Sequence, residues 1–253
     1  MTPSNSEPEV IDADSDIVEG KAPPSERVPL DRDRILDAAV TFVDQNGLRG
    51  LTMRRLGSEL GVEAMSLYRY VAGREELLDG IVEKVLTEMA EDSEIRDEPT
   101  DGWQDFLQRL AHGFRRVALA HPGVFPLLAA RPPEAPWIRP PLRDLQWVER
   151  FLNGLLGAGF SDATAVGAYR AFTSFLLGHL LLEVSTKGAD VGPLDILDPG
   201  TDPSPGLEEY PHVERLSKAL GEDHSATEFE ESLENLLDRL ALLLAEDAQD
   251  SAG

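Results

Sequence analysis

The chain has 253 residues, a formal net charge of −24 and no cysteine. The lack of cysteine excludes disulfides and thiolate metal sites, and the acidic excess argues against indiscriminate binding to nucleic acid. The start MTPSNSEPEVID does not resemble a secretory signal, and we expect no apolar run long enough to cross a membrane, so we expect a cytoplasmic protein.

The N-terminal part of the chain divides into a tail and a small helical segment. Residues 1–28 are polar and acidic, and we expect them to be disordered because they bury too little apolar surface to offset the entropy of ordering. Asp31 is placed to cap a first helix, which Gly47 ends. The apolar face of this helix is predicted to consist of Ile35, Ala38, Ala39, Phe42 and Val43.

Residues 51–78 have the pattern of a helix-turn-helix: a short helix, a tight turn, a second short helix and the start of a third. Thr52 is placed to cap the first short helix, and Gly61 can adopt the left-handed conformation that the turn needs. The second helix is predicted over about residues 63–70, before Gly73 breaks the chain. We expect the core here to contain Leu56, Leu60, Val62, Leu67 and Val71.

Basic side chains gather in the same segment. Residues 49–74 carry five basic and two acidic residues, a balance of +3, whereas the rest of the chain carries 18 basic and 45 acidic residues, a balance of −27. A DNA-binding face must neutralise phosphates. The segment is therefore the candidate DNA-binding face of an otherwise acidic chain.

The rest of the chain shows helical periodicities separated by breaks. Charged residues 91–102 and Pro-rich residues 131–141 are predicted to be connections, and residues 186–206 a mobile loop. Apolar residues recur at helical spacing from Trp103 to Phe114, and His121-Pro122-Gly123 breaks that helix. Further helices are predicted over residues 74–90, 124–130, 141–158, 161–185, 211–220 and 227–245. Ser161, with Asp162, is placed to cap the helix at residues 161–185. The apolar stripe of the helix at residues 74–90 is predicted to consist of Leu77, Leu78, Ile81, Val85 and Met89.

Several motifs resemble a known family in their order and spacing. The N-terminal ones are similar to the DNA-binding domain of the TetR (tetracycline-repressor) family: Ile35-Leu36-Asp37-Ala38-Ala39, Gly47, Leu51-Thr52-Met53-Arg54, Leu60-Gly61-Val62, Leu67-Tyr68-Arg69-Tyr70-Val71, Arg74 and Leu77-Leu78. A weaker resemblance to the tetracycline-repressor subclass rests on Trp103-Gln104-Asp105-Phe106-Leu107, Arg131-Pro132, Gly159-Phe160 and Leu177-Gly178.

The resemblance implies an all-α protein of two domains. Residues 29–75 would form a three-helix helix-turn-helix DNA-binding domain, residues 76–247 a larger helical domain for ligand binding and dimerisation, and residues 248–253 a frayed tail. It also implies a homodimer on a palindromic operator in double-stranded DNA, with two recognition helices in successive major grooves. A small-molecule effector would move the helix at residues 74–90 and so change the separation of the two heads.

The DNA-binding residues are predicted from their chemistry within this motif. Arginines can contact phosphate or guanine, hydroxyl groups can bond phosphate, and small apolar side chains can touch thymine methyl groups. The predicted set is Thr52, Arg54, Ala64, Met65, Ser66, Tyr68, Arg69, Tyr70 and Arg74. The alternative interpretation is a solvated face on an ordinary helical bundle.

The effector pocket is predicted from aromatic and apolar residues of the second domain, for which an ordinary helical core is the alternative. They are Phe106, Leu110, Phe114, Phe125, Leu127, Trp147, Phe151, Phe172, Phe175 and His179. Tetracycline-binding members of the subclass hold a magnesium chelate through histidine and asparagine, where this chain aligns Ala90, Leu110 and Leu127. These side chains cannot ligate a metal, so we expect a small, largely apolar effector and neither metal nor cofactor.

Three functional alternatives remain open from the sequence. The same fold can serve an activator or a regulator without an effector, and a helical interaction module can retain a helix-turn-helix that no longer binds DNA. An enzyme is disfavoured, because no nucleophile–base pair, metal cluster or phosphate-binding glycine loop is recognisable. Dimerisation is predicted through the helix at residues 161–185 and the leucine-rich final helix.

Overall fold

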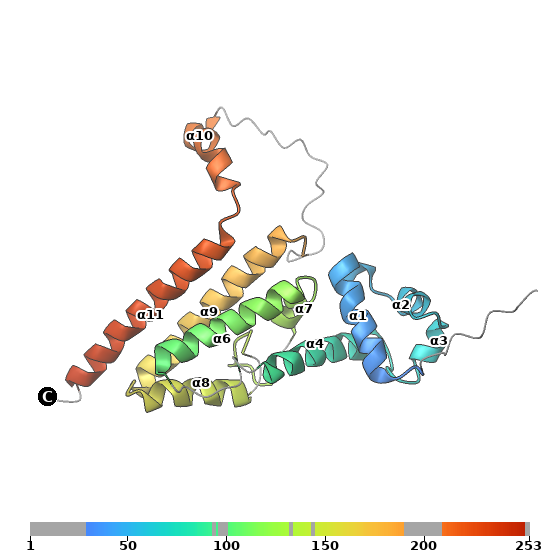
Figure 1. Ribbon diagram of the computed structural model, residues 1–253, viewed down its shortest axis with the longest axis horizontal. Coiled ribbons are helices and arrows are strands. Elements are labelled where there is room, and N and C mark those ends of the chain that lie inside the picture. Colours follow the sequence, from blue (N-terminus) through green and yellow to red (C-terminus); the bar gives the residue numbers. More distant parts are fainter. Residues whose placement is uncertain are drawn as a thin grey trace, which may run out of the picture. The chain divides into compact units, whose positions relative to one another are not determined.

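The computed structural model describes residues 29–92, 95, 101–131, 134–142, 145–189 and 209–250. Within these residues every regular element is a helix, which confirms the all-α prediction (Figure 1). The predicted disorder of residues 1–28 and most of the predicted mobile loop at residues 186–206 lie outside the described residues.

The first helices form a small head around an apolar centre. They are α1 (Arg32–Asn46), the 3-10 turn η1 (Leu48–Gly50), α2 (Met53–Glu59) and α3 (Ala64–Leu67). Both predicted caps are present: Asp31 accepts a hydrogen bond from the backbone N–H of Arg34 at 2.8 Å, and Thr52 accepts one from that of Arg55 at 3.2 Å. The fully buried side chains include Ile35, Leu51, Leu56, Leu67 and Val71. Leu60 and Val62, predicted as core, are only half-buried.

Helix α4 (Arg74–Glu91) packs against the head on one side and against later helices on the other. Its predicted apolar stripe is buried, and Gly80 allows α1 to approach closely, because an added Cβ would lie 2.6 Å from Leu36 Cδ2. Lys84 pairs with Asp37 of α1 at 2.6 Å. Helix α4 therefore contacts both α1 and two of the later helices.

The remaining helices are α6 (Trp103–Ala120), α7 (Phe125–Ala130), α8 (Leu145–Gly157), α9 (Asp162–Thr186), α10 (Pro211–Leu220) and α11 (Ser225–Asp250). Most of them pack on one central helix, α9, whereas α10 has no buried residue. Helix α9 contacts α6, α7, α8 and α11, and its N-cap is Ser161, as predicted. Figure 1 shows α6, α9 and α11 running side by side.

Three predicted boundaries are wrong. Helix α3 ends at Leu67, and residues 68–70 form a turn instead of a further helical turn. Helix α8 begins at Leu145 rather than at residue 141, after two consecutive prolines that cannot donate backbone hydrogen bonds. Helix α11 continues to Asp250, so the tail after residue 245 is not frayed there. Its last turns are held because Asp247 accepts hydrogen bonds from Ser161 and Thr164.

The expectation that no helix could cross a membrane also needs correction. Helix α9 is 25 residues long and apolar enough to qualify by length and composition. Its apolar character has another explanation, since it is the central helix on which α6, α8 and α11 pack. Phe172, Leu176 and Leu180 are fully buried there.

Candidate DNA interface and effector cavity

The turn between α2 and α3 is built from glycines and short backbone hydrogen bonds. The N–H of Val62 donates to the carbonyl oxygen of Gly57 at 2.9 Å, and Gly61 has a φ of +67°, the left-handed conformation predicted for it. An added Cβ on Gly57 would lie 2.9 Å from the Val62 carbonyl oxygen. Gly57 therefore allows α3 to pack tightly on α2. The sequence analysis missed this residue, although a glycine inside a short helix signals close backbone approach.

Helix α3 is anchored on one side and exposed on the other. Leu67 is fully buried, whereas Met65 is 72% exposed, Tyr68 44% and Tyr70 39%. Three large side chains exposed close together in this way form an apolar patch, which is the kind of surface that often contacts a partner. Arg69 is exposed beside them, while Ala64 and Ser66 are half-buried.

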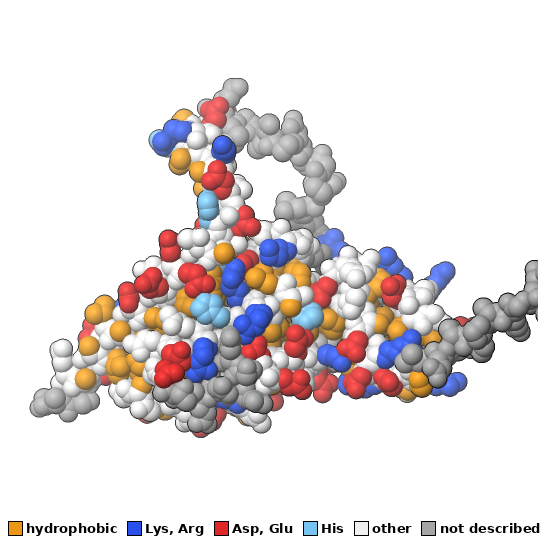
Figure 2. Space-filling view, in the orientation of Figure 1, with side chains coloured by type: hydrophobic (Ala, Val, Ile, Leu, Met, Phe, Trp, Pro, Cys, Tyr) orange, Lys and Arg blue, Asp and Glu red, His pale blue; other side chains and the backbone are white. Residues whose placement is uncertain are grey.

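The arginines of this segment divide into two kinds. Arg55 is held by the head, because its Nη1 donates to the Gly50 carbonyl oxygen at 3.1 Å and its guanidinium lies over the Phe42 ring. Arg74, at the start of α4, reaches the Leu48 carbonyl oxygen at 3.5 Å. Arg54 and Arg69 are exposed and have no carboxylate partner in the described part of the chain. Figure 2 shows basic side chains at the end of the molecule that carries α2 and α3.

A second site joins the head to the rest of the molecule. His121, directly after α6, places Nδ1 2.8 Å from Asp44 Oδ2 of α1 and Nε2 3.0 Å from Glu88 Oε2 of α4. The hydrogen bond with Asp44 raises the pKa of His121, burial opposes this shift, and Glu88 adds to it. The backbone N–H of Gly123 also donates to Asp44, and an added Cβ there would lie 2.5 Å from the Val43 carbonyl oxygen.

Sequence reasoning treated His121-Pro122-Gly123 only as a helix break. The three elements it joins are far apart in sequence, with Asp44 and His121 separated by 77 positions. No local pattern therefore signalled the contact. The consequence is that the corner between α6 and α7 is fixed to both α1 and α4.

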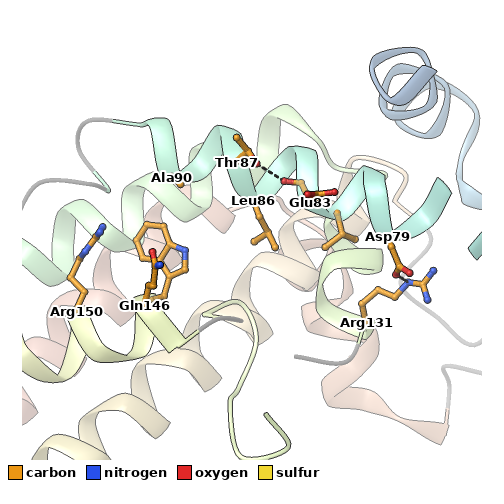
Figure 3. A pocket seen from close by; sticks show the side chains of 10 residues that line it. Asp79, Glu83, Leu86, Thr87, Ala90, Arg131, Gln146 and Arg150 are labelled. Atoms are coloured by element: carbon orange, nitrogen blue, oxygen red, sulfur yellow. Dashed lines mark hydrogen bonds and ion pairs between the residues drawn. The ribbon is translucent and has the colours of Figure 1, made fainter. Parts of the chain in front are cut away.

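A cavity of about 470 Å³ opens between α4, the end of α7 and α8. Apolar and polar side chains of α4 form its middle, and polar ones form its two ends. Figure 3 shows the arrangement, with Gln146 and Arg150 at one end, Asp79 and Arg131 at the other, and Leu86, Thr87 and Ala90 of α4 between them. Val82, Glu83 and Trp147 complete the lining. Of the predicted effector residues, Trp147 lines this cavity.

The other predicted effector residues lie in the core and pack largely on one another. Buried members form ring contacts, such as Phe114 with Trp147 at 6.0 Å between centroids and Phe151 with Phe172 at 5.3 Å. Phe175 and His179 are half-buried and stack on Phe229 of α11. The other four predicted residues are also buried: Phe106, Leu110, Phe125 and Leu127. Contact of these residues with an effector stays a prediction.

Helix α9 has one face that the described residues do not cover. Leu182 is 71% exposed there, and a Cβ added to Gly167 or Gly178, which share this face by helical spacing, would meet nothing within 4 Å. Leu242 of the neighbouring α11 is also exposed. Small residues on an apolar helix allow another helix to approach closely.

Comparison with protein families gives two matches along the chain. Residues 35–81 match the family described as bacterial regulatory proteins, tetR family, and residues 96–243 match the tetracyclin repressor-like C-terminal domain. The first match contains α2 and α3, and the second contains α6 to α10, whereas the cavity residues between Val82 and Ala90 of α4 lie between the two matches.

Individual relatives agree with these matches. The chain is 32% identical to the HTH-type transcriptional repressor DrrR1 of Streptomyces coeruleorubidus. The alignment covers 59% of this chain and 52%, about half, of that repressor. It is 32% identical to the class E tetracycline repressor of Escherichia coli, over 62% of this chain and 71% of that protein. The structure of ActR from Streptomyces coelicolor in complex with (S)-DNPA superposes with a TM-score of 0.57, at 29% identity, covering 87% of this chain and all of that one.

Proposed function

Because the chain belongs to the TetR family of bacterial regulatory proteins, we propose that it is a transcriptional repressor that binds a palindromic operator as a homodimer and is released by a small-molecule effector. The observation that carries this proposal is the exposed face of α3. Met65 of α3 and Tyr68 and Tyr70 of the turn that follows it are exposed, whereas Leu67 at the end of α3 is buried in the head. A soluble head leaves such side chains uncovered when they serve a partner.

The chemistry of this face fits double-stranded DNA. Arg54 and Arg69 supply positive charge without an internal carboxylate partner among the described residues, and the tyrosine hydroxyls can donate to phosphate oxygens. The remaining predicted contacts are Thr52, Ala64, Ser66 and Arg74. In our proposal α3 enters the major groove, with phosphates contacted by residues at the starts of α2 and α4.

The effector is proposed to bind in the cavity between α4 and α8. ActR has been crystallised with (S)-DNPA, and the tetracycline repressors take their name from a small molecule. Val82, Leu86, Ala90 and Trp147 offer the apolar surface that suits a largely apolar effector body. Binding without metal stays part of this proposal.

Helix α4 is proposed to carry the signal from the cavity to the head. It forms one wall of the cavity, pairs with α1 through Lys84 and Asp37, and is joined to the α6–α7 corner through His121. An effector can change the affinity for DNA only if it binds the two positions of α4 unequally. A small displacement of α4 suffices to weaken DNA binding. The two recognition helices of the dimer must reach half-sites that lie one helical turn apart, about 34–36 Å.

The dimer is proposed to form through α9 and α11. A twofold symmetric protein is what a palindromic operator requires. The open glycines and exposed Leu182 of α9 and the exposed Leu242 of α11 provide apolar surface for a second copy. The cytoplasm is the compartment in which such a repressor would meet its operator.

Selection from random DNA followed by affinity measurement tests the function. The wild-type chain should enrich a palindrome and retard that DNA in a gel. Tyr68→Ala should abolish the gel retardation, whereas Arg215→Gln on the exposed α10 should not. An activator or an effector-independent regulator would bind the same way but differ in a reporter assay. If no sequence is enriched, the alternative of a helical interaction module is favoured and the proposal fails.

A further inference from the structure

One polar atom in the wall of the effector cavity lacks a hydrogen-bond partner. Among the described residues Arg131 Nε is the buried side-chain nitrogen without an acceptor in hydrogen-bonding geometry. Leaving such a donor unsatisfied is costly, so native structures normally provide a partner, which can be a protein atom, a water or a ligand. The atom belongs to a residue that lines the cavity, so a ligand bound in the cavity is a candidate for the missing acceptor.

The rest of the Arg131 guanidinium is held by the start of α4. Nη1 pairs with Glu75 Oε2 at 3.0 Å, and Nη2 donates to the Glu75 carbonyl oxygen at 3.3 Å. Asp79 Oδ1 lies 3.4 Å from Nε, close enough for an ion pair but not for a hydrogen bond. Thus two nitrogens position the group, while the third, Nε, is buried and has the Asp79 carboxylate as its ion-pair partner.

The carboxylate nearest to Nε is not fixed in place. The Asp79 side chain is 68% exposed, whereas that of Arg131 is only 19% exposed. An exposed ion pair of this kind contributes little, because water screens it. Asp79 can therefore turn into solvent and leave Nε to another acceptor at small cost.

The opposite end of the cavity carries a second cation. Arg150 lies over the Trp147 ring at 5.0 Å from its centroid and has no carboxylate partner in the part of the chain that the structure describes. Gln146 lines the same end, and Leu86 and Ala90 lie between the two ends (Figure 3). The cavity thus has an arginine at each end, with the apolar Leu86 and Ala90 and the polar Thr87 and Glu83 of α4 between them.

We infer that the effector carries an anionic group, such as a carboxylate on an apolar ring system, and that this group accepts a hydrogen bond from Arg131 Nε. The inference rests on the proposed function, since it concerns the ligand of the same cavity. A charged acceptor is favoured over a neutral one because hydrogen bonds between ionised groups are shorter and about twice as strong. The apolar body would lie along Leu86, Ala90 and Trp147.

The test compares two molecules of equal shape, 2-naphthoate and 2-naphthamide, by calorimetric titration of the full chain without DNA. The wild type should bind the carboxylate about tenfold more tightly than the amide, the difference expected from one charge-assisted hydrogen bond partly screened by water. Arg131→Gln should remove this preference. Asp79→Asn should increase it, because the competing carboxylate is gone. Arg239→Gln, on the exposed side of α11, should leave the preference unchanged.

Several results overturn the inference: equal affinity of the wild type for both probes, no binding of the carboxylate up to its solubility limit, or a preference that persists in Arg131→Gln. If Arg131→Gln does not fold, Asp79→Asn still decides, since an unchanged or reduced preference contradicts the role of Nε. The titration contains no DNA. A chain that selects an operator but binds both probes equally refutes only this inference, and the reverse outcome refutes only the proposed function.

Discussion

His121 Nδ1 lies 2.8 Å from Asp44 Oδ2, and this pair ties the corner after α6 to the end of α1. The second ring nitrogen of His121 lies 3.0 Å from Glu88 on α4. Both nitrogens can donate at once only when the imidazole is protonated. The junction between the head, α4 and the α6–α7 corner is therefore strongest in the charged state of one histidine.

This junction predicts a pH dependence of stability. The hydrogen bond to Asp44 raises the pKa of His121 above its ordinary value of 6.5, so the folded chain holds the proton more tightly than the unfolded chain. The contribution of protonated His121 to the free energy of unfolding should be complete below pH 6.5 and should disappear as the pH rises through the raised pKa. Denaturant unfolding across this pH range should show that the free energy of unfolding falls more steeply with rising pH for the wild type than for His121→Gln.

His212 on the exposed α10 provides the matched control for this measurement. His212→Gln should keep the wild-type slope of the free energy of unfolding against pH. Identical slopes for His121→Gln and the wild type would contradict the assignment.

Gly57 predicts a second change in stability. Alanine usually stabilises a helix relative to glycine, but here its Cβ would lie 2.9 Å from the Val62 carbonyl oxygen. We expect Gly57→Ala to lower the free energy of unfolding by about 1–3 kcal/mol, as overpacking does. Glu59→Ala, exposed on the same helix, should change it by less than about 0.5 kcal/mol. Chemical denaturation measures both, and stabilisation by Gly57→Ala would refute the close packing of α2 and α3.

The salt dependence of DNA binding tests the role of Arg69 as a phosphate contact. Each phosphate contact releases counterions, so its removal should reduce the slope of log affinity against log salt concentration by about 1. Fluorescence anisotropy on the selected operator should show this reduction for Arg69→Gln and none for Arg239→Gln. If Arg69→Gln keeps the full slope, Arg69 does not contact phosphate.

The proposed dimer surface predicts a change in oligomeric state. Leu182→Asp places a charge on the exposed face of α9, where it would be buried against the second copy at a large cost. Sedimentation equilibrium should show half the wild-type mass for this variant. Leu156→Asp, at an exposed leucine of α8 (40% exposed, against 71% for Leu182), should remain dimeric. A dimeric Leu182→Asp chain would exclude this face from the interface.

Features that depend on neighbouring residues could be predicted from the sequence. Asp31, Thr52 and Ser161 cap helices as expected because an N-cap acts within three residues of itself. The positive φ of Gly61 follows from the same local logic, since glycine has no Cβ to oppose it. The core positions Leu56 and Leu67 follow from helical spacing.

Features that depend on distant residues could not be predicted. Asp247 extends α11 by binding Ser161, 86 positions away, and no pattern around Asp247 indicates this. Arg131 belongs to one of the motifs that resemble the family, but Glu75, the residue with which it pairs, lies 56 positions away in the sequence. The aromatic residues assigned to the effector pocket fit a core equally well, because periodicity identifies a buried face but not an empty space within it.

The ratio of affinities for the selected palindrome and a scrambled duplex, at one salt concentration, tests the central claim most directly. If α3 reads the operator, the wild type should prefer the palindrome by at least about 10³-fold, and Tyr68→Ala should lose most of that preference while retaining its fold. A wild-type ratio near one, or a Tyr68→Ala ratio equal to that of the wild type, would contradict sequence recognition through α3.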